Sequence, residues 1–438
     1  MKPQIFKTDN STVSLRKIAK KVQSEYFFLV QENTEIEFLP NAEERFLQTA
    51  EAVNAGLLYA DYYQVSGEKT VIVPTIEYQY GSVRDDFDFG SVLFINTEIF
   101  KEILAYKINF KYAGLYFLRL MFSEHSIIFH IPEALYLSKK RAVLSTESAQ
   151  FAYVNPKNRE VQIEMEKAFT DFLLFSNQLI DHKKLIEINF KNIPEKFEHE
   201  ASVIIPVKNR EKTIGDAIQS VLSQKADFKF NLLIVDNYST DKTSEIIENF
   251  AKNEPEIIHI IPQNKFLNIG GCWNEAINHE KCGKFAVQLD SDDLYQSENT
   301  LQSIVNQFYK ENCAMVVGSY TMVDFALNPI PPFVIAHNEW SAKNGMNNAL
   351  RINGLGAPRA FFTPLIRKIQ FPNVSYGEDY AVGLRISREW KIGRIFDSIY
   401  LCRRWDSNSD SNISTETLNR YNFYKDKIRT IELSARIL

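Results

Sequence analysis

The second half of the chain alternates short apolar runs with stretches of helical periodicity, and this alternation constrains the fold more than any other feature. The apolar runs are residues 202–206, 232–235, 257–261 and 285–289. The helical stretches between them are residues 213–224, residues 244–250 and a segment ending at Ile277. Strands and helices that alternate at this spacing predict a parallel α/β sheet with right-handed crossovers.

Two of these predicted strands end in polar, acidic turns. Asp236 follows the run 232–235, and Asp290 follows the run 285–289. Ligands bind beyond the carboxyl ends of the strands in such sheets. We therefore expect Asp236 and Asp290 to line one crevice.

The second turn, Asp290-Ser291-Asp292-Asp293, has the composition of a cation site. Mg²⁺ and Mn²⁺ prefer carboxylate oxygens, and a nucleotide diphosphate needs such a cation to offset its charge. A cation there would also stabilise a leaving diphosphate. An ordinary polar turn has the same composition, so the four residues do not decide the question alone.

Five motifs occur in a recognisable order along this half of the chain. They are Val203-Ile204-Ile205-Pro206-Val207-Lys208-Asn209-Arg210, Ile234-Val235-Asp236-Asn237-Tyr238-Ser239-Thr240-Asp241, Asn268-Ile269-Gly270-Gly271 with Asn274, Gln288-Leu289-Asp290-Ser291-Asp292-Asp293, and Tyr376-Gly377-Glu378-Asp379-Tyr380. With them, residues 201–410 resemble the family 2 glycosyltransferases of GT-A fold. The resemblance implies a Rossmann-related mixed sheet flanked by helices, and inverting, metal-dependent sugar transfer from a nucleotide-diphosphate sugar, with UDP as the expected nucleotide.

The resemblance also implies roles for individual residues. Asp379 would be the catalytic base, with Glu378 as its rival, and the loop from Gly354 to Arg359 would shape the sugar and acceptor pocket. Asp292 and Asp293 would hold Mn²⁺ or Mg²⁺. The implied donor-binding residues are Pro206, Asn209, Arg210, Asp236, Asn237, Asn268, Asp290 and Asp292.

Three departures from the family pattern narrow these implications. Asn237 stands where many relatives carry a second Asp, which leaves the nucleobase open, and an Arg often found near Asn268 is missing. The segment Cys402-Arg403-Arg404-Trp405 resembles the Gln-x-x-Arg-Trp motif of processive synthases but lacks its Gln. A non-processive transferase is therefore expected.

The first half of the chain resembles the second in the order of its segments. Residues 24–34 match 283–293, residues 57–62 match 315–320, residues 90–96 match 356–362, residues 112–120 match 376–384, and residues 134–140 match 398–404. This pattern predicts a degenerate, truncated copy of the same fold, and chance similarity of α/β patterning is the alternative. The acidic turn has become Gln31-Glu32-Asn33-Thr34 and the pair Glu378-Asp379 has become Gly114-Leu115, so the copy would lack the chemistry.

Four regions follow from this comparison. Residues 1–150 would be the degenerate copy or an accessory α/β domain, residues 151–200 a helical linker, residues 201–410 the catalytic domain and residues 411–438 a C-terminal helix. We expect the four scattered cysteines to be reduced thiols.

Composition excludes some partners and indicates a compartment. A net charge of -5 gives no basic footprint for nucleic acid. No apolar run approaches the ~18–20 residues of a membrane span, and the N-terminus has no apolar signal segment. A cytoplasmic enzyme is expected, peripheral to the inner face of the membrane where it meets a lipid-linked acceptor.

Three functions compete at this point. The favoured one is transfer of a hexosyl or N-acetylhexosaminyl group to a glycan or lipid-linked acceptor in cell-surface polysaccharide synthesis. The second is a sugar-nucleotide nucleotidyltransferase, for which Val207-Lys208-Asn209-Arg210-Glu211 is a poor signature loop. The third is a non-catalytic module that binds glycans or proteins.

Overall fold

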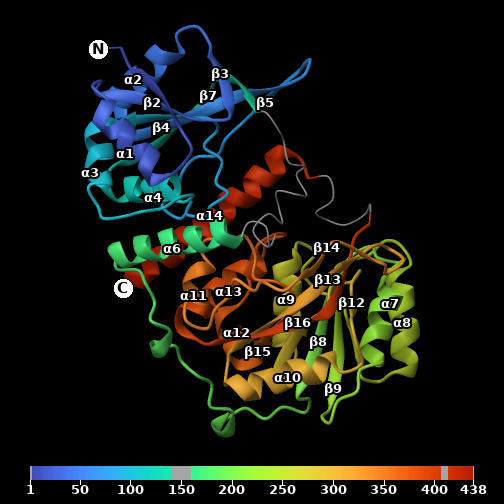
Figure 1. Ribbon diagram of the computed structural model, residues 1–438. Helices are drawn as coiled ribbons and strands as arrows, with labels where there is room; N and C mark the ends of the chain where they lie inside the picture. Colours follow the sequence, from blue (N-terminus) through green and yellow to red (C-terminus); the bar gives the residue numbers. More distant parts are fainter. Residues whose placement is uncertain (1, 141–158, 406–412, 438) are drawn as a thin grey trace. The chain divides into compact units, whose positions relative to one another are not determined.

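The computed structural model describes residues 2–140, 159–405 and 413–437, which fall into two compact units (Figure 1). Unit 1 consists of Met1–Leu179, Leu350–Ile352 and Ile413–Leu438. Unit 2 consists of Ile180–Ala349 and Asn353–Asn412. Each unit has its own sheet.

This division differs from the expected one at two points. Helix α6 (Arg159–Phe175) belongs to unit 1, so the first boundary lies near Leu179, and the expected linker 151–200 is not a separate region. The C-terminal helix α14 (Thr415–Ile437) also belongs to unit 1. The first residues of the expected linker, 151–158, lie outside the described residues.

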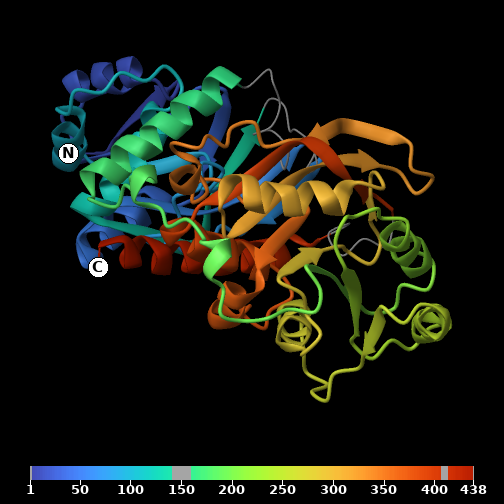
Figure 2. The same cartoon turned by 90° about the horizontal axis from the view of Figure 1, so that it is seen from below.

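The first four strands of unit 2 form the predicted parallel sheet. They are β8 (Ala201–Val207), β9 (Phe230–Asp236), β10 (Ile257–Ile260) and β11 (Phe285–Gln288), in the order β10-β9-β8-β11. Helices α7 (Ile214–Leu222), α8 (Thr243–Asn253) and α9 (Ile269–Asn278) connect them. Right-handed crossovers place α8 and α9 on opposite sides of these strands (Figure 2).

The rest of the unit 2 sheet is mixed. The order continues from β11 as β15-β13-β16-β12, and β14 pairs with β13. β15 is antiparallel to both β11 and β13, whereas β16 is parallel to β13. The bounds are β12 (Leu294–Tyr295), α10 (Thr300–Glu311), β13 (Met315–Val323), β14 (Pro329–Ile335), α11 (Gly345–Asn348), β15 (Arg359–Phe362), α12 (Thr363–Ile369), α13 (Glu378–Glu389) and β16 (Ile392–Arg403). The expected fold class, a mixed α/β sheet flanked by helices, is confirmed.

The sheet of unit 1 has the order β1-β2-β6-β4-β7-β3, with β5 paired to β4. Its elements are β1 (Gln4–Thr8), α1 (Thr12–Lys21), β2 (Tyr26–Gln31), β3 (Thr34–Phe38), α2 (Ala42–Val53), β4 (Ala55–Ser66), β5 (Lys69–Val73), β6 (Val92–Asn96), α3 (Thr97–Leu104), α4 (Gly114–His125) and β7 (Ile127–Lys140). Its core includes Phe28, Phe46 and Phe94, which are fully buried and contact one another.

Strand for strand, this order matches β8-β11-β15-β13-β16-β12 of unit 2, with β5 in the place of β14. The strand directions agree in every pair. The registers agree as well: Phe28 lies opposite Phe94, and the matching Val287 lies opposite Ala360. β1 occupies the position of β8, although the sequence comparison started the copy after that strand. Counterparts of β9 and β10 do not occur among the described residues of unit 1.

The two units also share backbone details at corresponding positions. Thr97 and Thr363 each begin a helix, and each side chain donates a hydrogen bond to a backbone carbonyl. Thr97 donates to Ser24, just before β2, at 2.7 Å, and Thr363 donates to Gly283, just before β11, at 2.6 Å. Gly90 and Gly356 both have positive φ, at 71° and 103°. These shared features are what a duplication predicts, and duplication remains our interpretation.

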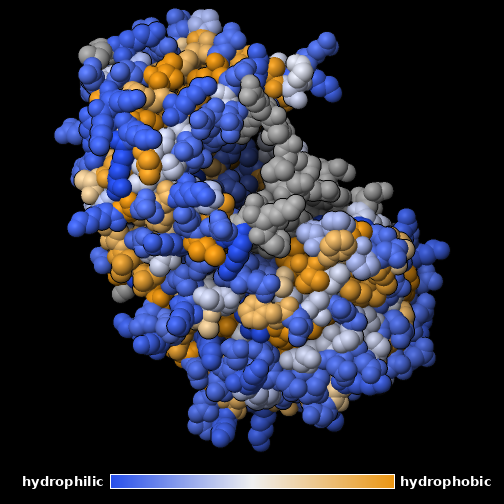
Figure 3. All heavy atoms as spheres, viewed as in Figure 1, coloured by the Kyte–Doolittle hydropathy of each residue, from blue (hydrophilic) through white to orange (hydrophobic). Residues whose placement is uncertain are grey.

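The remaining sequence expectations concern thiols and the surface. All four cysteines lie in the described residues and are free; Cys272, Cys282 and Cys313 are buried. None of the helices in the described ranges combines the length and the apolar composition of a membrane span. On the face drawn in Figure 3, hydrophilic residues predominate and apolar ones are scattered among them, as on ordinary protein surfaces.

Candidate active site

The loops after β8 and β9 are tied together by the residues expected to bind the nucleoside. The Asn209 side chain accepts a hydrogen bond from the Thr240 amide at 2.7 Å, and the Asn209 amide donates to the Ser239 hydroxyl at 2.9 Å. Pro206 lies on β8 opposite Val235. The two loops therefore form one rigid edge of the sheet.

Asp236 is held in its charged form at the end of β9. Its side chain is 1% exposed, and burial raises its pKa. The His259 imidazole, 3.5 Å from the carboxylate, and hydrogen bonds from Ser244 and Ser239 outweigh burial and lower the pKa to about 2. Asp236 is therefore a fixed negative charge and acceptor at neutral pH.

Asn237 and Asn268 differ in what they offer a ligand. Asn237 donates to the Leu267 carbonyl at 2.8 Å, while its buried side-chain oxygen has no hydrogen-bond partner. The Asn268 side chain is engaged at both ends, with the Asn373 carbonyl at 3.2 Å and the Ser375 hydroxyl at 2.7 Å. Asn268 thus anchors the segment that leads into α13, whereas Asn237 keeps an acceptor for another group.

Asp290 and Asp293 belong to a buried network under the acidic turn. The Tyr400 hydroxyl accepts a hydrogen bond from the Asp290 amide at 3.0 Å and also hydrogen-bonds the Asp293 carboxylate. Asp293 accepts the Arg403 amide at 2.7 Å. Burial, followed by repulsion from neighbouring carboxylates, raises the pKa of Asp293 well above its usual range, and burial raises that of Asp290. The charged forms of these carboxylates are therefore disfavoured by their surroundings, and a bound cation would offset that cost.

Asp292 is the member of the turn that reaches toward neighbouring loops. Its carboxylate is 13% exposed and lies 3.7 Å from Nε of Arg210. The indole of Trp405 donates to it at 3.3 Å. The turn is thus linked to the loop after β8 through Arg210, as the donor-binding assignments require.

Within the described residues, no three His, Cys, Asp or Glu side chains come together as a metal-binding group. A cation on a diphosphate needs only one or two protein carboxylates, because phosphate and water supply the other ligands. The oxygen donors and the raised pKa values of the turn fit a hard divalent cation. Asp292 is placed to hold it, whereas Asp293 is committed to Tyr400 and Arg403.

The expected base lies on the first turn of α13. The helix begins at Glu378, after Gly377 in a left-handed conformation with φ of 85°. The Asp379 carboxylate is 25% exposed and pairs with Nη1 of Arg359 at 2.6 Å. Glu378 is 7% exposed, and burial followed by the charge of Asp379 raises its pKa to about 8. Glu378 is therefore mostly protonated at neutral pH, which makes it the weaker candidate for the base.

The sequence did not identify Arg359 and Gln288 as site residues. Arg359 had been noted only as the end of the Gly354–Arg359 loop, and Gln288 only as part of a motif. The Gln288 side chain donates to Asp290 at 2.8 Å and accepts the Arg359 amide at 3.1 Å. The internal comparison could have identified these two residues, because unit 1 has the apolar residues Leu29 and Leu93 at the corresponding positions of β2 and β6.

Residues 202–368 match the model of Glycosyl transferase family 2. This segment is a family 2 glycosyltransferase domain. It covers the nucleoside loops, the acidic turn and Arg359, and α13 follows it directly in unit 2. This match does not support the alternative of a non-catalytic module that binds glycans or proteins.

Two curated relatives that match the glycosyltransferase domain are glucosyltransferases by name. The chain is 27% identical over 211 residues to the Escherichia coli UDP-Glc:alpha-D-GlcNAc-diphosphoundecaprenol beta-1,3-glucosyltransferase WfgD, covering 48% of this chain and 78% of that protein. It is 26% identical over 246 residues to the poly(ribitol-phosphate) beta-glucosyltransferase of Bacillus spizizenii, covering 53% of this chain and 37% of that protein.

Among solved structures, residues 1–349 of S. aureus TarS in complex with UDP-GlcNAc align with 52% of this chain and 70% of that chain. The sequence identity is 21% and the TM-score 0.39.

Proposed function

We propose that unit 2 transfers a sugar, with inversion, from a UDP-sugar to a hydroxyl of a glycan or lipid-linked acceptor. The observation that carries the proposal is the pair formed by Asp379 and Arg359 beside the acidic turn. It puts a carboxylate next to the place where a diphosphate would bind. The relative WfgD, whose printed name specifies a UDP-Glc donor and a diphosphoundecaprenol-linked acceptor, supports the substrate classes.

Each residue has a defined task in this reaction. Asp236 and the unpartnered oxygen of Asn237 accept hydrogen bonds from the nucleoside. Asp379 takes the proton from the acceptor hydroxyl, whose oxygen attacks the anomeric carbon as the bond to the diphosphate breaks. A divalent cation on Asp292 would offset the charge of the leaving diphosphate. The products are the glycosylated acceptor and UDP.

Glu378 is unsuited to the base role, because its pKa of about 8 keeps it protonated. Asp379 is partly exposed and forms an ion pair with the guanidinium of Arg359. The proposal therefore assigns proton transfer to Asp379 and leaves Glu378 as a neutral neighbour.

The test combines donor binding with product analysis. Nucleotide sugars with Mn²⁺ should raise the melting temperature selectively, and Asp292→Ala should abolish that rise. Asp379→Asn should bind the donor normally while kcat falls by about 10²–10⁴-fold. The exposed Asp227→Ala is the matched control and should behave as wild type.

NMR of the product should show an inverted anomeric configuration. Full transfer activity in Asp379→Asn would overturn the base assignment. Release of inorganic pyrophosphate from a nucleoside triphosphate and a sugar phosphate would identify a nucleotidyltransferase instead.

A further inference from the structure

A comparison of corresponding positions in units 1 and 2 separates the residues of unit 2 that the fold requires from those that serve the chemistry. Unit 1 repeats the strand order and registers of unit 2 around β2, β6 and α4. Positions filled by equivalent side chains in both units meet a need of the fold. The fold does not require a particular side chain at positions where the two units differ.

The features kept in both units are backbone devices. Thr97 and Thr363 make the same hydrogen bond, and Gly90 and Gly356 both adopt positive φ. Asn54 and Asn312, at the C-termini of α2 and α10, are both left-handed. None of these residues carries a charge that could take part in sugar transfer.

The differences gather at one end of the sheet. Leu29 and Leu93 face each other across β2 and β6, where the next pair of the β11–β15 ladder is Gln288 and Arg359. Leu115 is the second residue of α4, as Asp379 is of α13. Gln31 stands where unit 2 has Asp290, so three leucines and Gln31 of unit 1 correspond to four charged or polar residues of unit 2, Gln288, Asp290, Arg359 and Asp379.

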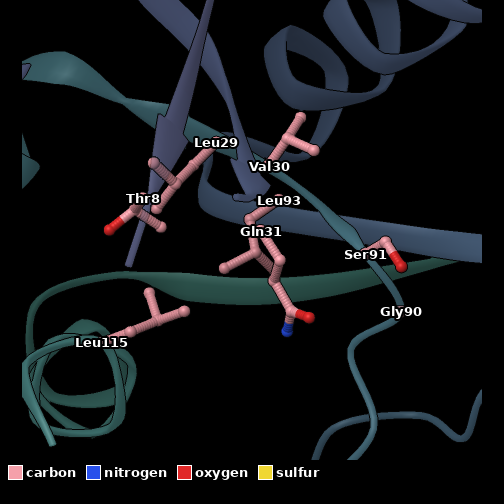
Figure 4. A pocket seen from close by; sticks show the side chains of 8 residues that line it. All are labelled: Thr8, Leu29, Val30, Gln31, Gly90, Ser91, Leu93 and Leu115. Carbon is pink, nitrogen blue, oxygen red and sulfur yellow. The ribbon is translucent and has the colours of Figure 1, made fainter. Parts of the chain in front are cut away.

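In unit 1 these four side chains line one small cavity, together with Thr8, Val30, Gly90 and Ser91 (Figure 4). Figure 4 shows Leu93 and Gln31 beside each other and Leu115 facing them from α4. The cavity volume of about 20 Å³ holds roughly one water molecule. The fold thus closes stably with leucine at both strand positions, so unit 2 does not need Gln288 and Arg359 in order to fold.

In unit 2 the same positions form a continuous polar chain. The Gln288 side chain hydrogen-bonds Asp290 at 2.8 Å and accepts the Arg359 amide at 3.1 Å. Arg359 donates to the Gly356 carbonyl at 2.9 Å and pairs with Asp379 at 2.6 Å. Its guanidinium is 17% exposed and fixed at two points, so it holds the Asp379 carboxylate in one orientation.

We propose that Arg359 is the positioning residue of Asp379, and that Gln288 fixes Arg359 to the donor side of the site. The inference rests on the proposed function, because it requires Asp379 to be the base. Misplacing a catalytic group by about 1 Å costs on the order of 10²-fold in rate. Loss of Arg359 should therefore reduce kcat by about 10²-fold while donor affinity stays nearly constant.

The experiment replaces Gln288 and Arg359 with the residues that unit 1 carries. Arg359→Leu should lower kcat by about 10²-fold, with the dissociation constant for UDP and Mn²⁺ changed by less than about threefold. Gln288→Leu should lower kcat less. Arg359→Lys keeps the charge without the planar fork and should recover part of the lost rate. Arg385→Leu, which removes an ion pair with Glu389 on the same helix, is the matched control.

A double-mutant cycle separates positioning from other roles. If Arg359 acts through Asp379, then Arg359→Leu should cost almost nothing in an Asp379→Asn background. An equal loss in both backgrounds would overturn the proposal, as would wild-type kcat in Arg359→Leu. Loss of UDP affinity with unchanged kcat would make Arg359 a donor ligand instead.

The wild type and Asp379→Asn distinguish failure of the positioning role from failure of the proposed function. If the wild type transfers no sugar, or if Asp379→Asn keeps full activity, the proposed function and the positioning role fall together. If both behave as proposed and only Arg359→Leu is unaffected, the positioning role alone falls.

Discussion

Adjacent carboxylates can differ widely in burial and in their charged partners, as Glu378 and Asp379 show. Both lie on the first turn of α13, and the sequence alone does not separate them. The structure buries Glu378 and gives Asp379 a guanidinium partner. Burial and ion pairing arise from segments distant in sequence, so local pattern does not encode which carboxylate is charged.

Glu378→Gln tests this difference through stability. The folded-state pKa of Glu378, about 8, lies above the unfolded value, so the folded protein loses stability as pH rises from about 4.5 through 8. The variant has no such loss. It should therefore become increasingly more stable than wild type across that window, by at most about 1.4 kcal/mol per pH unit. Chemical denaturation at several pH values measures it, and a constant difference from pH 5 to 8 would contradict the prediction.

At the scale of elements, the junction between strand and helix is the most reproducible part of the fold. Thr97 and Thr363 follow β6 and β15 directly, and each hydroxyl reaches back to a neighbouring strand. Both side chains are buried, at 8% and 0% exposure. A hydroxyl that donates to a buried carbonyl stabilises the folded state. A residue without a donor at that position would leave the carbonyl without a hydrogen bond.

Thr97→Val and Thr363→Val should each destabilise their own unit by about 1–3 kcal/mol, because each leaves a buried carbonyl without its partner. Hydrogen exchange should show the loss of protection around α3 in the first variant and around α12 in the second. Thr97→Ser and Thr363→Ser keep the hydroxyl and serve as controls. If the valine variants are as stable as the serine variants, the junction does not depend on this bond.

The sequence predicted these elements better than their pairing. Apolar periodicity is local, so the strands at 202–206 and 232–235 and the helix at 213–224 were placed correctly. The antiparallel insertion of β15 between β11 and β13 is a long-range pairing that no local pattern encodes. Gly270 illustrates the same limit: a Cβ there would lie 1.9 Å from the Pro372 carbonyl, so close packing alone requires that motif glycine.

At the scale of the whole molecule, one chain carries two sheets that share an order of six strands, and one set of charged site residues. The internal comparison predicted the loss of chemistry in unit 1, and the small cavity adds a steric reason. Small-molecule sites are typically ~300–1,000 Å³, far larger than the cavity of about 20 Å³ at Leu93 and Leu115. At this position the described residues of unit 1 therefore offer neither the carboxylates nor the space for a nucleotide sugar.

Titration calorimetry with UDP and Mn²⁺ should consequently give one site per chain. Gln31→Glu, which places a carboxylate at the position corresponding to Asp290, should leave both stoichiometry and affinity unchanged, because the surrounding leucines still close the cavity. Asp292→Ala should remove the single binding event, since Gln31, Asn33 and Thr34, which stand in unit 1 where unit 2 has Asp290, Asp292 and Asp293, carry no carboxylate. A stoichiometry near two, or binding that survives Asp292→Ala and is lost on altering Gln31, would show that unit 1 holds a donor site of its own.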